Sequence, residues 1–315
     1  MITIQSITEY QRKHSTAITI GTFDGIHIGH HKILKKLIKN AAKSELKSIV
    51  LTFFPHPRMV LQKDADIKLL NTLDEKAQIL ENLGLDFLII HPFTKDFSRL
   101  TATEFVRDLL VNELNAKKII IGYDHRFGRN RTANITDLIA YGNSLDFDVE
   151  EISAQEIDEV SVSSTKIRKA LEKGDIRTAN SYLGYDYMLT GSIEKGKGLG
   201  RKIDFPTANL HIPETYKLIP KIGVYVVYSI IKGSKVYGMM NIGYNPTVDK
   251  NPDSDHQKER IEIHFFDFNN DLYNQELQIH IIHRIRDEHK FDSVDALKNQ
   301  LKKDEETSRS IISKL

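Results

Sequence analysis

The sequence predicts an α/β protein with two domains: a parallel sheet covered by helices, then a small closed antiparallel β-barrel that ends in a helix. Residues 17–180 alternate short β-rich runs with segments of helical spacing, which is typical of a parallel sheet. From about Tyr187, polar and apolar residues alternate with a period of two and few helical segments intervene. The tail from Ser293 returns to helical spacing. We therefore expect domains at residues 1–184 and 185–315.

The first domain contains five short apolar or β-branched runs that we expect to be strands of the parallel sheet. Helical spacing lies between them, for example in Leu73–Leu83 and Ala102–Asn112. Three hydroxyl side chains, Ser163, Ser164 and Thr165, can cap the first turn of a later helix. The expected strands are Ala17–Ile20, Ser48–Phe53, Phe87–His91, Lys118–Ile121 and Phe147–Glu150.

The second domain contains strands of a different kind. Val224–Ile231 and Lys235–Ile242 predict two antiparallel strands, joined by a two-residue hairpin turn at Gly233-Ser234. Arg260–Phe265 alternates polar and apolar residues with a period of two, and Leu277–Ile282 continues in the same way. Several antiparallel strands with few helices between them predict a small closed barrel.

The composition argues against several classes of protein. Lys and Arg number 44 against 43 Asp and Glu, a formal charge of +1, so neither nucleic acid nor a membrane surface is favoured as a partner. The chain has no cysteine, which removes disulfides, thiolate nucleophiles and zinc–thiolate sites. No apolar run approaches the ~20 residues needed to span a bilayer, and Met1–Ser6 lacks a basic signal-peptide region. We therefore expect a soluble, cytoplasmic protein.

A turn rich in glycine and histidine follows the first expected strand, with the sequence Gly21-Thr22-Phe23-Asp24-Gly25-Ile26-His27-Ile28-Gly29-His30. Its glycines let the backbone approach an anion, and the helix that follows supplies free N–H groups and positive potential at its start. His27 and His30 are three residues apart, so one turn of helix brings both to the same side. Two imidazoles beside bound phosphates suggest stabilisation of charge during phosphate transfer. The alternative is a structural turn with two surface histidines.

Other phosphate-binding patterns do not fit this chain. The turn matches neither the GxGxxG dinucleotide fingerprint nor the Walker A pattern. Gly191 and Gly196-Lys197 have the Walker spacing, but Gly198 stands where a Ser or Thr must hold Mg²⁺. We therefore reject a P-loop.

The two-histidine turn resembles the HxGH signature of the nucleotidyltransferase superfamily, and its Gly-Thr-Phe-Asp-Gly lead resembles the FMN adenylyltransferase module of prokaryotic FAD synthetases. The resemblance implies a Rossmann-like first domain in which the phosphate of FMN attacks the α-phosphorus of ATP. It implies that His27 and His30 are catalytic, with His30 at the α-phosphate. The residues implied to bind the phosphates of ATP are Gly21, Phe23, Asp24, Gly25 and Gly29.

Three further segments carry the same resemblance: Thr52–Pro57 resembles TFxPHP, Gly122–Gly128 resembles GxDFxFG, and Ser163–Arg168 resembles SSTxIR. Two positions differ from the family, because His125 replaces an aromatic residue and Ala133 replaces a glycine. Taken alone, the first segment is an ordinary loop and the third is a plain helix cap with a solvated arginine. The resemblance implies an anion cradle of Ser163, Ser164 and Thr165 with Arg168 as a catalytic residue, and a flavin site of Phe54, Pro55, His56, Asp124, Phe127 and Arg131.

A second set of motifs lies in the second half, where Gly198–Leu210 resembles the GRxxGFPTAN signature of riboflavin kinases. The resemblance implies a glycine-rich flap around the phosphates of ATP and oxygen ligands for Mg²⁺, which a hard cation prefers. Asp204 stands where the family has glycine. Asp tolerates positive φ better than most residues, but its charge would repel ATP unless it points away or helps to hold the metal. The residues implied are Gly198, Gly200 and Arg201 for ATP, and Thr207 and Asn209 for Mg²⁺.

Two downstream segments continue this resemblance. Asn241–Thr247 resembles the NIGxxPT turn, and Arg260–Tyr273 resembles VExHxxDFxxDLYG. Asn274 replaces the glycine that follows, and it can also adopt left-handed geometry. In this segment Glu262 matches the catalytic carboxylate of the family.

The resemblance gives Glu262 the role of a base. A ribityl hydroxyl that attacks the γ-phosphate of ATP benefits from a group that accepts its proton. Alternation puts Glu262 on the face opposite Ile261 and Ile263, although a strand Glu without this context is usually a solvated side chain. Ile285–Leu297 resembles the family's C-terminal IRxExKF…L segment and implies that Arg286 binds flavin.

Together the resemblances cover nearly the whole chain and imply a bifunctional enzyme that converts riboflavin to FMN, and FMN to FAD, with ATP and Mg²⁺. Fold similarity alone proves neither activity. Two alternatives stay open: a monofunctional FMN adenylyltransferase whose kinase domain is impaired by Asp204, and a flavin-binding regulator without turnover. The implied partners are riboflavin, FMN and ATP, and the oligomeric state is not predicted.

Overall fold

The computed structural model describes the 315-residue chain except for residues 63–65, 124, 154–161, 197–199, 201–202 and 245–258. The chain divides into two compact units, Met1–Ser163 and Ser164–Leu315, and each is described by itself. Among the described residues, no helix is both long enough and apolar enough to cross a membrane.

The first unit is built on a six-stranded sheet in the order β1-β4-β3-β2-β5-β6, and every pair of neighbours in it is parallel. This confirms the parallel sheet expected from the sequence. The edge strand β1 was missed, because it has three residues and too little pattern to be recognised. The strands are β1 (Ile2–Ile4), β2 (Thr16–Ile20), β3 (Lys47–Phe54), β4 (Phe87–Pro92), β5 (Ala116–Gly122) and β6 (Asp148–Ile152).

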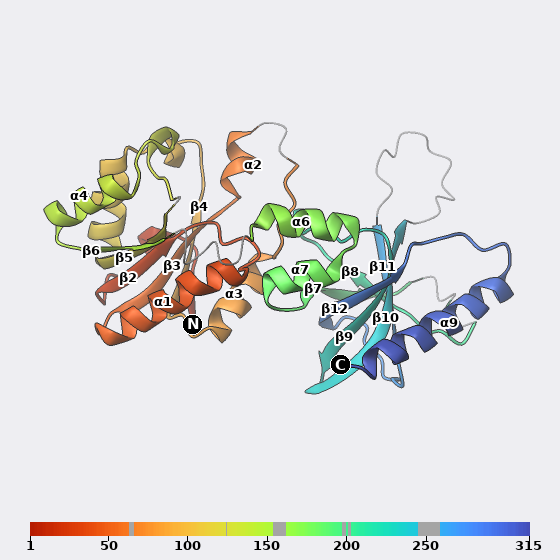
Figure 1. Ribbon diagram of the computed structural model, residues 1–315. Coiled ribbons are helices and arrows are strands. Elements are labelled where there is room, and N and C mark those ends of the chain that lie inside the picture. Colours follow the sequence, from red (N-terminus) through yellow and green to blue (C-terminus); the bar gives the residue numbers. More distant parts are fainter. Residues whose placement is uncertain (63–65, 124, 154–161, 197–199, 201–202, 245–258) are drawn as a thin grey trace. The chain divides into compact units, whose positions relative to one another are not determined.

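Helices cover this sheet (Figure 1). On one side α1 packs against β2, β3 and β5. Apolar side chains of β2 and β3, such as Ile18 and Ile49, form a core with Phe105 and Leu110 of a π-helix. The described helices are α1 (Ile28–Lys43), α2 (Pro57–Leu61), α3 (Leu73–Asn82) and α4 (Ile135–Leu145), the 3-10 turns η1 (Ile7–Glu9), η2 (Phe97–Arg99) and η4 (Arg129–Arg131), and the π-helix η3 (Glu104–Glu113).

The second unit contains a closed antiparallel barrel with the strand order β10-β11-β8-β7-β12-β9, as the period-two pattern predicts. Two helices precede the barrel, and α7 packs on β7 and β12. The compact unit therefore begins at Ser164. That residues 1–184 carry one activity and residues 185–315 the other stays a prediction. The elements are α6 (Ser164–Lys173), α7 (Ile176–Leu183), β7 (Tyr187–Glu194), β8 (Ala208–His211), β9 (Gly223–Ile231), β10 (Ser234–Tyr244), β11 (Glu259–Phe265), β12 (Glu276–Arg286) and α9 (Val294–Ile312).

The hairpin between β9 and β10 differs by one residue from the expectation. Ile231 pairs with Ser234, so the two turn residues are Lys232 and Gly233 rather than Gly233 and Ser234. Both have positive φ, 50° and 81°, as a type I′ turn requires. The turn therefore places glycine at its second central position.

Candidate active sites

The loop between β2 and α1 has an unusual backbone. Phe23, Gly25 and Ile26 have φ values of 43°, 86° and 35°. Positive φ is a genuine strain for a β-branched residue such as Ile26. Both Phe23 and Ile26 are buried, so packing holds the loop in this shape. Such strain is often found where a backbone is arranged for a ligand.

His27 and His30 lie together at the start of α1. The ring of His27 caps the helix, because its Nδ1 accepts a hydrogen bond from the backbone N–H of His30 at 3.4 Å. The two rings stack with their centroids 3.7 Å apart. The predicted pairing of the two histidines on one side is confirmed, but His27 is buried and His30 is partly buried, with its Nδ1 enclosed, rather than on the surface.

Burial decides the charge of these histidines. It lowers the pKa of His27 to about 4, with a smaller contribution from His31. It also holds the pKa of His30 well below its usual range, helped by His27, Lys76 and His31. Both rings are therefore neutral at pH 7 and act there as hydrogen-bonding groups. The Nδ1 of His30 is buried and has no hydrogen-bond partner within the described parts of the chain.

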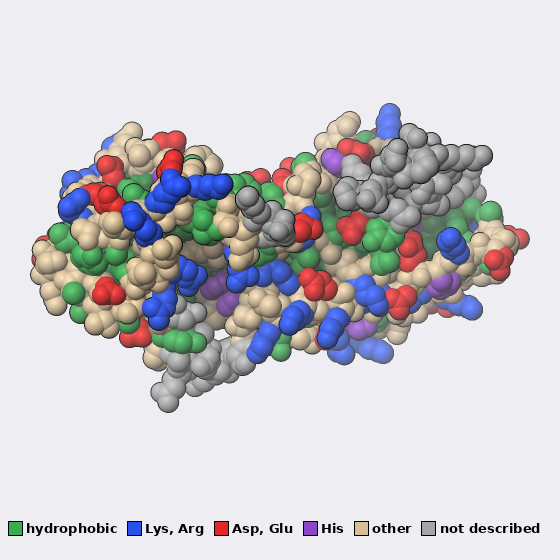
Figure 2. Space-filling view, turned by 90° about the horizontal axis from the view of Figure 1, so that it is seen from above, with side chains coloured by type: hydrophobic (Ala, Val, Ile, Leu, Met, Phe, Trp, Pro, Cys, Tyr) green, Lys and Arg blue, Asp and Glu red, His purple; other side chains and the backbone are tan. Residues whose placement is uncertain are grey.

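A cavity of about 430 Å³ opens beside this loop. Figure 2 shows histidine side chains within a hollow of the surface. Five of the predicted site residues line this cavity. They are Gly21, Phe23, His30, Phe127 and Arg131.

Other predicted residues of this half have structural contacts of their own. Asp24 is 3% exposed, and its Oδ1 accepts a hydrogen bond from Leu70 N at 2.8 Å. His56 caps α2, with its Nδ1 accepting from Arg58 N at 3.1 Å. The segment around Phe54, Pro55 and His56 contributes its neighbours Phe53 and Pro57 to the cavity. Gly25 and Gly29 lie in the buried turn, and Asp124 lies outside the described residues.

Sequence reasoning missed the aromatic wall of the cavity. Phe93 and Phe97 surround Phe53, with ring centroids 5.8 and 5.4 Å from it, and all three line the cavity. His125, which replaces a family aromatic residue, stacks on Phe127 at 6.3 Å. Phe93 follows the carboxyl end of β4, and parallel sheets bind ligands at that edge. This position in the sequence could have identified Phe93 as a site residue.

The point in the sequence at which the chain divides into two units falls within the predicted cradle Ser163–Arg168. Ser163 ends the first unit, and α6 begins at Ser164 in the second. Ile167 is buried and its neighbour Arg168 is partly exposed. The grouping of Ser163, Ser164, Thr165 and Arg168 with the histidine turn stays a prediction.

A second polar cluster lies on the barrel. Glu262 of β11 is the register partner of Asn209 on β8. Thr207 Oγ1 donates to Glu262 Oε1 at 3.3 Å. Arg260 joins the group, because its Nη2 lies 2.6 Å from Glu262 Oε1 and its Nε donates to Asn209 Oδ1 at 3.1 Å. The predicted residues Asn209 and Glu262 are therefore brought together by one guanidinium, and Thr207 joins them through Glu262.

The alternation predicted for β11 is also confirmed. Ile261 and Ile263 are buried, while Glu262 is only partly buried. Sequence reasoning gave no role to Arg260. It is two residues before Glu262, so a period of two puts both side chains on the same face, and this signal was present in the sequence.

The flap before this cluster needs glycine at Gly200. A Cβ there would come within 2.2 Å of the carbonyl oxygen of Phe205. Phe205 N donates to Gly200 O at 2.9 Å and closes the turn. The predicted ATP-binding residues Gly198 and Arg201 lie outside the described residues.

Asp204 adopts the conformation that the family glycine would allow. Its φ is 65°. Its carboxylate accepts a hydrogen bond from Lys298 Nζ of α9 at 2.6 Å, and this bond lowers the pKa of the Asp204 carboxyl. The charge that could repel ATP is thus bound to the C-terminal helix.

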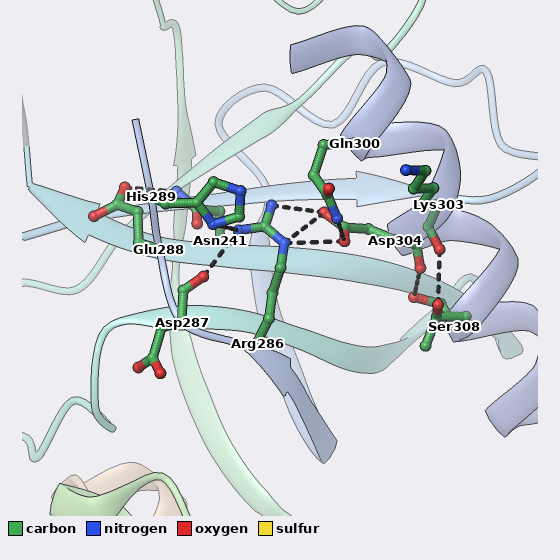
Figure 3. Close-up of polar contacts among 10 residues, drawn as sticks. Asn241, Arg286, Asp287, Glu288, His289, Gln300, Lys303, Asp304 and Ser308 are labelled. Carbon is green, nitrogen blue, oxygen red and sulfur yellow. Dashed lines mark hydrogen bonds and ion pairs between the residues drawn. The ribbon is translucent and has the colours of Figure 1, made fainter. Parts of the chain in front are cut away.

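Arg286, predicted to bind flavin, is bound to the protein itself (Figure 3). Its Nε and Nη2 donate to the carboxylate of Asp304 at 3.0 and 2.7 Å. Asp304 is 1% exposed and also accepts from Gln300 at 2.8 Å. Arg286 Nη1 donates to the carbonyl oxygen of Asp287. In this structure Arg286 fastens α9 to the end of β12, and its flavin role stays a prediction.

Comparison with known proteins shows that the two halves of the chain match two family models. The FAD synthetase model matches residues 9–166, and the riboflavin kinase model matches residues 183–312. The chain belongs to the bifunctional riboflavin kinase/FMN adenylyltransferase family. It is 37% identical to the family member of Listeria monocytogenes, with 95% of this chain and 93% of that protein covered. It is 36% identical to that of Escherichia coli K12, with 93% and 91% covered.

A solved structure shares the whole architecture. A crystal structure from Streptococcus pneumoniae, described as a macrolide-efflux protein, superposes with a TM-score of 0.86 and 33% sequence identity over 98% of both chains. The name macrolide-efflux protein applies to the Streptococcus pneumoniae protein. The similarity covers both units of this chain.

Proposed function

We propose that this chain phosphorylates riboflavin to FMN in its second unit and transfers an adenylyl group from ATP to FMN in its first. The observation that carries the proposal is that both sets of family motifs fold into clusters suited to phosphate chemistry. One is the stacked His27–His30 pair beside a cavity, and the other is the Glu262–Thr207–Asn209 cluster.

In the adenylyl step, a phosphate oxygen of FMN forms a bond to the α-phosphorus of ATP, and the bond to the bridging oxygen of pyrophosphate breaks. The attacking phosphate is already anionic, so the site has to position it in line and stabilise charge on the α-phosphate. His30 offers a neutral ring with an unpartnered, buried Nδ1 for that purpose. The loop Gly21–Gly25 leads to the N-terminus of α1, which supplies free N–H groups and positive potential.

The flavin ring is proposed to lie in the aromatic cavity. Phe53, Phe97 and Phe127 supply flat apolar surfaces, and Arg131 supplies a cation at the same cavity. Its volume of about 430 Å³ is in the range of small-molecule sites. Phe54, Pro55, His56 and Asp124 remain proposed flavin contacts by family resemblance.

In the kinase step, a ribityl hydroxyl of riboflavin attacks the γ-phosphorus of ATP, and ADP leaves. Glu262 is proposed to orient the hydroxyl and accept its proton. Arg260 orients the carboxylate through its 2.6 Å contact. The proton then resides on Glu262 until it returns to solvent.

Magnesium is proposed to be held in this cluster by Thr207 and Asn209. The donor set fits in kind, because hard oxygen ligands suit this ion. The Thr207 hydroxyl lies 3.3 Å from Glu262 Oε1, and Asn209, whose side-chain oxygen accepts from Arg260, is the strand partner of Glu262. When bound, the ion neutralises charge on the phosphates of ATP. A cytoplasmic location, where ATP is supplied, also stays a prediction.

A product analysis tests the proposal. The purified protein is incubated with ATP and Mg²⁺ and with either riboflavin or FMN, and chromatography separates the flavins. We expect FAD from both starting flavins. FAD from FMN alone would favour the adenylyltransferase with an impaired kinase, and no conversion of either would favour the flavin-binding regulator.

A further inference from the structure

A buried lysine lies behind the histidine turn. Lys76 of α3 is 4% exposed, which is rare for a lysine. Its Nζ donates to the carbonyl oxygen of Thr22 at 2.7 Å. Glu75 and Thr72 form a capping box at the start of α3, so the helix turn that carries Lys76 is itself fixed.

Lys76 contacts the loop between β2 and α1 next to its residues with positive φ. Thr22 precedes Phe23, the first of the residues with positive φ. Its carbonyl oxygen also accepts a hydrogen bond from Thr52 Oγ1 at 3.2 Å. A carbonyl oxygen has two lone pairs, and two donors engage them here. Thr22 lines the cavity, where a free carbonyl oxygen would repel a phosphate.

The charge of Lys76 is balanced inside the same turn. Burial lowers the pKa of Lys76 to about 8, and the buried Asp24 opposes part of that shift by attracting the ammonium. The lysine is therefore mostly charged at pH 7. Its positive charge also contributes to keeping the nearby His30 neutral.

We propose that Lys76 is a positioning residue for adenylyl transfer: its ammonium fixes the Thr22 carbonyl and thereby the turn that presents His30 to the phosphates of ATP. The inference rests on the proposed function of the first unit. It assigns a role to α3, which carries none of the family motifs described above.

The test replaces Lys76 by Met, which keeps the aliphatic stem and removes the ammonium. Because a misplacement of about 1 Å can cost 10²-fold in rate, we expect kcat for FAD formation to fall about 30- to 100-fold while KM for FMN changes little. Riboflavin phosphorylation should be unchanged, because that site lies in the second unit. Thermal unfolding of the first unit reports whether the variant is folded there. Lys76→Arg should restore part of the rate, because it returns a cation to Thr22.

Lys47→Met is the matched control. Lys47 is the first residue of β3, at the opposite end of that strand from the proposed site. It forms an ion pair with Asp86 that is partly exposed to solvent. This variant should keep both activities. The inference is overturned if Lys76→Met forms FAD at the rate of the control.

Two further measurements cover other outcomes. If Lys76→Met does not fold, Lys76→Gln removes the charge and shortens the reach to Thr22 O while keeping a hydrogen-bond donor, and it should lower FAD formation by about 10-fold or more. A rate equal to that of Lys47→Met would refute the inference. If the unaltered protein makes no FAD, the proposed function fails, and hydrogen exchange decides the inference. Lys76→Met should then speed amide exchange in residues 21–27 but not in β4, and equal exchange would contradict it.

Discussion

At the residue scale, burial is the property that shapes the histidine turn. The sequence shows two histidines three apart, but only the packed structure shows that their rings stack, that His27 is buried and that the Nδ1 of His30 is enclosed. Enclosure makes the rings neutral at pH 7, so in the proposed adenylyl transfer they would bind phosphate oxygens as hydrogen-bond donors. A bound anion would raise the pKa of each ring and favour its charged form.

This burial predicts an acid-sensitive stability. The pKa of His27 is about 4 in the folded chain and about 6.5 when unfolded, so the unfolded state binds more protons between these values. The stability contributed by neutral His27 is therefore present above about pH 6.5 and is lost as pH falls toward 4, by about 3 kcal/mol. Denaturant unfolding at pH 7.5 and 4.5 measures the loss.

His27→Gln is the comparison for that measurement, because glutamine does not titrate in this range. The variant should show a smaller decrease in unfolding free energy between the two pH values. An identical decrease in unfolding free energy in both proteins would show that burial does not lower the pKa of His27.

At the element scale, α9 holds parts of the kinase half together. Its Leu297 and Leu301 pack against a cluster that includes Ile203 and Phe205 of the flap. Two ion pairs add to this packing, Lys298 to Asp204 and Arg286 to Asp304. The C-terminal helix is therefore a structural support of the flap that is proposed to cover ATP.

Asp204→Gly restores the family residue and tests whether Asp204 weakens the kinase. The Asp204 carboxylate is 80% exposed, so its ion pair contributes little. We expect riboflavin phosphorylation to change by less than about fivefold, the effect of a surface ion pair. A gain of more than about tenfold in steady-state kcat would mean that Asp204 impairs the kinase.

Asp304→Asn should have a large effect on stability. It leaves the partly buried Arg286 without its carboxylate partner, and breaking such a pair costs about 3–5 kcal/mol. Thermal unfolding of the second unit measures the loss. Asp267→Asn is the control, because its pair with Arg309 is exposed and should matter little; equal unfolding midpoints for the two variants would contradict the assigned role.

At the scale of the whole molecule, local patterns predicted the fold well. Strand β2 and the alternation in β11 could be read directly, because neighbouring residues determine which faces are buried. The candidate residues His30 and Glu262 were also found from contiguous motifs.

The parts that could not be predicted depend on contacts between distant residues. Lys76 meets Thr22 across 54 positions, and Lys298 meets Asp204 across 94. No periodicity or spacing encodes such pairs. The three-residue strand β1 is likewise defined by its pairing with β4 rather than by its own sequence.

The central claim is that two separate sites in one chain carry the two steps, and it is tested most directly by flavin product analysis of His30→Ala and Glu262→Ala. His30→Ala should convert riboflavin to FMN at the normal rate and form no FAD. Glu262→Ala should convert FMN to FAD normally and phosphorylate riboflavin about 10²- to 10⁴-fold more slowly. Loss of both steps in either folded variant would contradict the two-site account.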